Sequence, residues 1–227
     1  IDPLAQIFID HDFEIVPVLE TLLSSEHFFD TTFRGCIVKN PVEFFIGSMI
    51  QFNVLEESNL IDNHEIWIDF YVQLGFLAMD PGNPPSVAGW PAYYQPPKFH
   101  QWWINSSSLN LRAKIVSDLC TKEGLFYNGF TFKFHFIPFV SNFEHPEDEH
   151  ILVENCISFL FSVAINDSEK EKLTDLLNGQ ANQQESWTEL WKSYQNKKDD
   201  IEKRESTENR LREFFKRLLN LPEFQMM

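Results

Sequence analysis

The sequence has little glycine, little cysteine and no long apolar run. Only 8 of its 227 residues are glycine, which argues against an all-β chain built on many tight turns. The three cysteines, at positions 36, 120 and 156, are odd in number and far apart, so they indicate neither a zinc site nor a disulfide framework. No apolar run approaches the roughly 18 residues that a membrane span requires.

Basic residues are also scarce. Lysine and arginine total 18 against 34 aspartates and glutamates, which gives a formal charge of −16. A surface this acidic repels phosphate backbones and anionic membrane surfaces, so no nucleic-acid partner is expected. A cationic partner or a divalent metal would suit the charge, although plain solubility also explains it. No cofactor is predicted.

Phenylalanine, by contrast, is abundant, with 23 residues. Rings of this size bury much apolar area, and a chain of this length is sufficient for one large core. The sequence therefore predicts a single helical domain over residues 1–227, with 146–227 as a candidate helical subdomain.

Helical spacing of apolar residues recurs along the chain, and the fold class predicted is all-α. The clearest helix start is Asn40-Pro41-Val42-Glu43, where Asn caps, Pro takes the first helical position and Glu43 completes a capping box. Other helices are expected over 13–24, from 63 to a stop at Gly75, over 106–119, from Pro146, from Asp167 or Ser168 to 178, over 187–194 and over 211–218. The polar stretch 197–209 fits either an exposed helical turn or a loop.

Two segments break this pattern. Phenylalanines alternate at 130, 132, 134 and 136, which predicts one short extended segment near 130–139. Residues 79–105 contain six prolines, so we expect a long loop that cannot be helical.

The aromatic residues of this loop are the best candidates for a binding surface. Exposed Trp and Tyr beside amides suit a glycan or a peptide. The interpretation we favour over this one is that Trp90 and Trp103 plug the helical core. Asn105 and Arg112 would then donate hydrogen bonds to loop carbonyls, and Arg112 is the residue most suited to hold a carboxylate, structural or from a ligand. The ligand-binding candidates are Trp90, Tyr93, Tyr94, Trp102, Trp103, Asn105 and Arg112.

Catalytic signatures are not found. The sequence contains no G-x-S-x-G, no phosphate-binding loop and no H-E-x-x-H motif. His145 and His150 flank three acidic residues and are weak candidates for metal ligands, but Pro146 interrupts the segment and the acids suit a helix N-terminus.

Four segments carry a family resemblance. They are Pro84-Pro85-Ser86-Val87-Ala88-Gly89-Trp90-Pro91, Lys39-Asn40-Pro41-Val42-Glu43-Phe44, Trp103-Ile104-Asn105 with Leu109 and Arg112, and the closing stretch 218–225. Taken in the order of the chain, they resemble the large bacterial family known as domain of unknown function 1800. The resemblance implies the C-terminal part of a longer protein, without the family's N-terminal helical region. It also implies export to the periplasm or cell surface, although no signal peptide is visible in this chain. It brings no catalytic residues.

Two functions remain open at this point. The leading expectation is a non-enzymatic, exported interaction or scaffold module with a protein or glycan partner. The alternative is part of a hydrolase-like enzyme that acts on an extracellular polymer such as a glycan. An interaction module should present a flat aromatic patch, whereas an enzyme should bring carboxylates or histidines together in a cleft.

Overall fold

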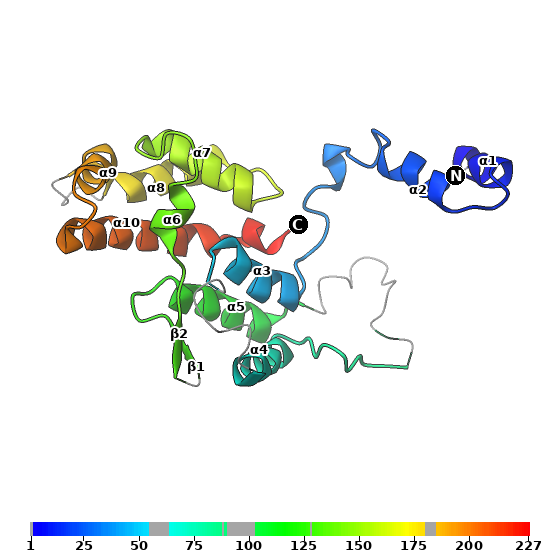
Figure 1. Ribbon diagram of the computed structural model, residues 1–227, viewed down its shortest axis with the longest axis horizontal. Coiled ribbons are helices and arrows are strands. Elements are labelled where there is room, and N and C mark those ends of the chain that lie inside the picture. Colours follow the sequence, from blue (N-terminus) through cyan, green and yellow to red (C-terminus); the bar gives the residue numbers. More distant parts are fainter. Residues whose placement is uncertain (1, 55–63, 88, 90–102, 128, 180–184) are drawn as a thin grey trace. The chain divides into compact units, whose positions relative to one another are not determined.

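The computed structural model describes residues 2–54, 64–87, 89, 103–127, 129–179 and 185–227. Within them the chain is mainly helical, as the sequence predicts, and it also has one small two-stranded hairpin (Figure 1). The contacts divide the chain into two compact units, Ile1–Cys36 and Ile37–Met227. Each unit is described separately below.

Unit 1 contains two short α-helices that pack on each other. They are α1 (Asp2–Asp10) and α2 (Val16–Leu23), followed by the 3-10 turn η1 (Thr31–Phe33). The helix expected within 13–24, with a start near Pro17, forms as Val16–Leu23, with the proline in its first turn. None of residues 2–36 is buried, and Leu19 and Leu23 are exposed despite their helical spacing. The apolar stripe of α2 therefore finds no core within its own unit.

Unit 2 contains the remaining elements of the described residues. Its helices and strands are α3 (Pro41–Gln51), α4 (His64–Phe76), α5 (Ser106–Leu119), β1 (Leu125–Tyr127), β2 (Phe130–Phe132), α6 (Phe136–Val140), α7 (Glu149–Leu160), α8 (Asp167–Asn178), α9 (Trp187–Asn196), α10 (Ile201–Leu219) and the 3-10 turn η3 (Pro222–Gln225). Helix α10 packs against α5, α6, α8 and α9 (Figure 1). It is therefore the element around which unit 2 is organised.

Phenylalanine rings form the centre of the unit 2 core. Phe136 and Phe215 stack with centroids 4.4 Å apart and planes 3° apart. Phe52 meets both rings edge-on and lies tilted against Phe134 and Phe139. Such pairs stabilise beyond the area that they bury, so the unusual phenylalanine content is explained by this cluster.

The predicted extended segment over 130–139 is only partly right. Phe130–Phe132 pairs antiparallel with Leu125–Tyr127, with Leu125 opposite Phe132. The chain then turns into α6, in which Phe136, Phe139 and Val140 are all buried. Spacing of three and four residues places these side chains in the core, so the helical period replaces the strand period after Phe134.

Several predicted helix bounds also change. Helix α4 continues through Gly75 to Phe76, and α7 begins at Glu149 under the Asp148 cap instead of at Pro146. Asn166, instead of Asp167 or Ser168, caps α8. The polar stretch 197–209 is mostly the first half of α10, which begins at Ile201 after the Asp200 cap.

None of the helices in the described part of the chain combines the length and the apolar character that a membrane span requires.

Candidate functional site

Segments that are distant in sequence meet where the chain closes. The amide of Lys39 donates to the carbonyl of Gln225 at 2.8 Å, and the amide of Met227 donates to the carbonyl of Ile37 at 2.8 Å. An isolated antiparallel bridge between Val38 and Met226 completes this pairing. The start of α3 and the end of the chain are therefore tied together, and both belong to segments that carry the family resemblance.

Arg112, from a third such segment, joins the other two. It is fully buried on α5. One terminal nitrogen donates to Gln225 Oε1 at 3.0 Å, and the other donates to the carbonyl of Lys39 at 2.9 Å. The guanidinium lies 4.7 Å from the centroid of Phe44, a distance that suits cation–π attraction. We call Lys39, Phe44, Arg112, Phe224 and Gln225 the Arg112 junction.

Arg112 holds no carboxylate of a described residue, and a carboxylate from a ligand stays a prediction. Its described partners are an amide oxygen and a backbone carbonyl, and neither is charged. Burial without a described counter-charge lowers the pKa of Arg112 to about 10, because desolvation disfavours the cation. Its Nε is buried and has no hydrogen-bond partner in the described part of the chain.

Lys39 places a second cation in the same junction. Its ammonium lies 3.9 Å from the centroid of the Phe224 ring. Burial is the main cause that lowers the pKa of Lys39 to about 8, with Arg112 adding to the effect and Glu43 opposing it. Enzymes that use lysine as a general base lower its pKa to roughly 7 to 8. Lys39 is therefore a residue of chemical interest that sequence reasoning missed.

The helix caps beside the junction follow the local sequence. Asn40 accepts from the amides of Val42 and Glu43, while Glu43 accepts from the amide of Asn40, as the predicted capping box requires. Asn105 makes a reciprocal cap with Ser108 on α5.

The bonds described for Asn105 and Arg112 do not reach carbonyls of the proline-rich loop, and the prediction that these side chains bond the loop stays a prediction. The Asn105 side chain accepts from backbone amides, and Arg112 reaches Lys39 and Gln225. Ser108 is the residue that bonds the loop, since its Oγ donates to the carbonyl of Trp103 at 3.0 Å. Trp103 is half-buried. The other aromatic candidates lie outside the described residues: Trp90, Tyr93, Tyr94 and Trp102.

A hollow of about 280 Å³ lies at the start of α7, beside α9. His145, Glu147 and Asp148 line it from the loop before α7, and Thr188 and Lys192 line it from α9. His145 Nδ1 lies 3.4 Å from Glu147 Oε1. Because the two sets of residues are about 40 positions apart, the sequence showed only the first set. We call this hollow the His145 hollow.

Two hydrogen bonds from helix α9 fix the loop of the His145 hollow. Trp187 Nε1 donates to the carbonyl of Pro146 at 2.8 Å, and Thr188 Oγ1 donates to the carbonyl of Glu147 at 2.8 Å. His145 has a φ of 50°, which is rare for a residue with a side chain. Backbone strain of this kind persists only where the surroundings impose it, and it is common at functional sites.

The two histidines proposed as weak metal ligands do not share this hollow. His145 lines it, whereas His150 is exposed on α7 and is not among the lining residues. Residues 2–54, 64–87, 89, 103–127, 129–179 and 185–227 contain no group of three or more His, Cys, Asp or Glu side chains arranged to hold a metal ion.

Comparison with known proteins gives one match. No curated protein and no solved structure matched the chain. The model of the family described as "Protein of unknown function (DUF1800)" matches residues 1–226. The segments that meet at the Arg112 junction lie within this match, and the chain belongs to the DUF1800 family.

Proposed function

We propose that this chain is a non-enzymatic interaction or scaffold module, exported to the periplasm or the cell surface. The observation that carries the proposal is that polar residues of the segments with the family resemblance form structural bonds at the Arg112 junction and in the helix caps beside it. Asn40 and Asn105 cap helices, and Arg112 holds Lys39 and Gln225 together. Side chains engaged in this way hold a frame in place, and a rigid frame is what a presenting module needs.

The described ends of the proline-rich loop support the same proposal. At its start, Asn83 donates to Asp80 through its side chain at 2.7 Å and through its backbone at 3.0 Å. At its end, Ser108 holds the carbonyl of Trp103. Loops carried on fixed supports are common binding elements. The proposed contact residues are the aromatic candidates of the sequence, and the proposed partner is a protein or a glycan.

A thermal-shift screen of the whole chain against neutral oligosaccharides and peptides tests this proposal, with product analysis on every mixture that gives a shift. A ligand that binds only the folded state raises the unfolding midpoint with its concentration. The proposal expects a saturable shift without product, lost in Tyr93→Ala/Tyr94→Ala and kept in the matched control Phe126→Ala, whose ring is exposed on β1. Cleaved ligand, or equal loss in both variants, contradicts it.

A second candidate function is favoured by the His145 hollow. A histidine, two carboxylates and a lysine line this one cavity. General acid–base chemistry uses such an arrangement, so the hollow supports the alternative of a hydrolase-like enzyme. Under this alternative, one of the oligosaccharides or peptides is cleaved, and both Glu147→Gln and His145→Asn abolish cleavage. Unchanged cleavage in both variants rules this hollow out as the site.

A further inference from the structure

A second hollow in unit 2 is basic, in a chain that is strongly acidic. It encloses about 300 Å³ beside the first half of α10. Lys122, Lys133, Arg204 and Arg212 line it, together with Glu205 and Glu208. Four cations against two carboxylates leave two positive charges, whereas the whole chain carries −16. We call this hollow the α10 basic pocket.

The carboxylates of the pocket already have partners. Glu205 forms an ion pair with Lys122. Glu208 Oε1 accepts from the backbone amide of Phe136 at 3.3 Å. The ammonium of Lys122 is the main cause that lowers the pKa of Glu205, with smaller effects from Arg212 and Lys133. These effects indicate a positive potential around Glu205, and they come from residues on several elements.

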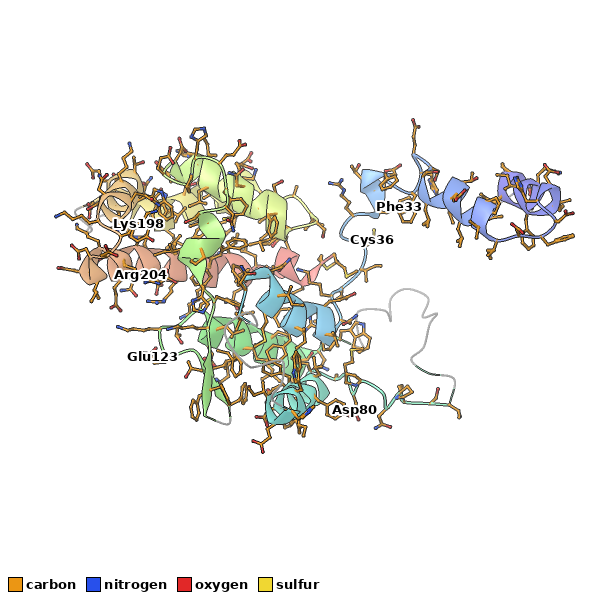
Figure 2. All side chains as sticks on the ribbon, in the orientation of Figure 1. Phe33, Cys36, Asp80, Glu123, Lys198 and Arg204 are labelled. Carbon is orange, nitrogen blue, oxygen red and sulfur yellow. The ribbon has the colours of Figure 1, made fainter. Side chains whose placement is uncertain are left out.

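The remaining cations are less engaged. Arg212 donates to Asn209 Oδ1 at 2.6 Å, which is a neutral acceptor. Lys133 and Arg204 make no side-chain hydrogen bond or ion pair with any residue that the structure describes. Arg204 is exposed on α10 (Figure 2). Lys133 and Arg204 therefore leave cationic donors in the pocket that no described acceptor of the chain engages.

The backbone fixes where these side chains lie. Arg204, Glu208 and Arg212 are spaced by four residues on α10 and share one face. Lys122 and Lys133 flank the base of the hairpin, where Gly124 has a φ of 71°. A Cβ on Gly124 would lie 2.4 Å from the carbonyl oxygen of Phe132 and 3.1 Å from Lys133 Cβ. Only glycine fits there without a shift, so the two ends of the hairpin are held close to each other.

We propose that the α10 basic pocket binds an oxyanion, phosphate or sulfate, either as the free ion or as an ester on a sugar. Two excess positive charges match the dianion of free phosphate, free sulfate or a phosphate ester, and they also attract the single charge of a sulfate ester. Arginine and lysine together supply the directional donors and the point charge that such groups prefer. Ile201, which is 79% exposed, and Pro138 also line the pocket. Apolar surface of this kind gives the carbon frame of an ester something to pack on.

Titration calorimetry on the whole chain tests the proposal, with inorganic phosphate, inorganic sulfate and a sulfated oligosaccharide as probes at constant ionic strength. The test variant is Lys133→Ala/Arg204→Ala. The matched control is Lys197→Ala/Lys198→Ala, which removes the same two charges at exposed positions that do not line the pocket. Lys198 is labelled together with Arg204 in Figure 2.

The proposal expects saturable binding of at least one probe. The test variant should weaken it by about tenfold or more, because a hydrogen bond to a charged group contributes about that factor. The control should leave it unchanged. Tighter binding of the sulfated oligosaccharide would identify the ester as the ligand, and tighter binding of inorganic phosphate or sulfate would identify the free ion. No saturable binding, or equal weakening in both variants, overturns the proposal.

A backbone variant checks the site without removing a charge. Gly124→Ala should disturb the hairpin base and weaken binding of the same probe, whereas Gly129→Ala should not, because no atom lies within 4 Å of a Cβ placed at Gly129. Both glycines have positive φ, so both substitutions introduce the same backbone strain and differ only in the contacts of the new Cβ. Equal effects of the two variants on binding would contradict a site built on this hairpin base.

Discussion

Arg112 and Arg204 belong to the same unit but are used in opposite ways. Arg112 is fully buried, and both of its terminal nitrogens bond to segments far away in sequence. Arg204 is exposed at the rim of a hollow and has no described side-chain partner. Both residues are arginines, so the difference lies in burial and in whether the protein itself accepts hydrogen bonds from the terminal nitrogens. Arg112, whose terminal nitrogens both have acceptors, holds the fold, whereas Arg204 is available to a ligand.

The comparison also explains where an acidic chain places its few cations. At the Arg112 junction one cation is fully buried and the other is half-buried, and aromatic faces and neutral oxygens lie where carboxylates pair with cations elsewhere. In the α10 basic pocket the cations face solvent, and carboxylates neutralise only part of their charge. The predictions below test whether the first site is structural and the second is not.

The largest effect is expected at Arg112. Arg112→Met removes both donated hydrogen bonds and leaves the oxygens of Lys39 and Gln225 without a donor, so the free energy of unfolding should fall by about 3 kcal/mol. Arg204→Met should change it by less than about 0.5 kcal/mol. Urea-induced unfolding of both variants gives the two values. Similar losses in the two variants would remove the distinction drawn here.

A smaller effect is expected from pH at Lys39. Its pKa is about 8 in the folded state, below the value of roughly 10.4 in an unfolded chain. Between these values the unfolded state binds more protons, so the free energy of unfolding contributed by Lys39 rises as pH increases above 8. After allowance for solvent screening, the free energy of unfolding should rise by about 1 to 2 kcal/mol over the whole interval between the two pKa values.

The Lys39 effect is measured as a difference from Lys39→Met, by urea unfolding at intervals from pH 7 to 9.5. The stability of the wild-type chain relative to this variant should increase with pH. Lys197→Met, which changes an exposed lysine, should show no such trend. A flat difference for Lys39→Met would mean that the ammonium is not desolvated by the junction.

The helix caps at the edge of the junction should contribute less again. Asn40→Ala removes an acceptor for two backbone amides, and such substitutions typically cost about 1 kcal/mol. Asn105→Ala removes the equivalent acceptor on α5 and should cost a similar amount. Thermal unfolding of both variants checks this. A loss near that of Arg112→Met would show that the caps belong to the junction itself.

The sequence predicted what is local at this site and missed what is distant. The Asn40 capping box depends on residues within three positions of each other, so its pattern is visible in the sequence. The partners of Arg112 lie 73 and 113 positions away, and no local pattern indicates them. Arg112 was recognised as the polar residue on an apolar helix face, but its two described partners are neutral oxygens that no local pattern indicates.

Two segments show where the sequence pattern left the secondary structure open or misjudged it. The first half of α10 carries only Thr207 among its buried residues, so the apolar stripe that identifies helices is absent there. The Asp200 cap and good helix formers extend the helix without it. After Phe134 the alternating phenylalanines suggested a strand, but packing of Phe136 and Phe139 on Phe52 and Phe215 favours a helical turn. Local capping and helix propensity decided the first case, and tertiary contacts decided the second.

The smallest effect on stability is expected at the α10 basic pocket. Lys133→Ala/Arg204→Ala removes no described hydrogen bond or ion pair, so the free energy of unfolding should stay within about 0.5 kcal/mol of the wild-type value. Urea unfolding without added phosphate or sulfate measures this. A loss of 2 kcal/mol or more, near the roughly 3 kcal/mol expected for Arg112→Met, would mean that these cations also hold the fold. An unchanged free energy of unfolding combined with weakened oxyanion binding would show that the cations of the α10 basic pocket serve a ligand, whereas Arg112 serves the fold.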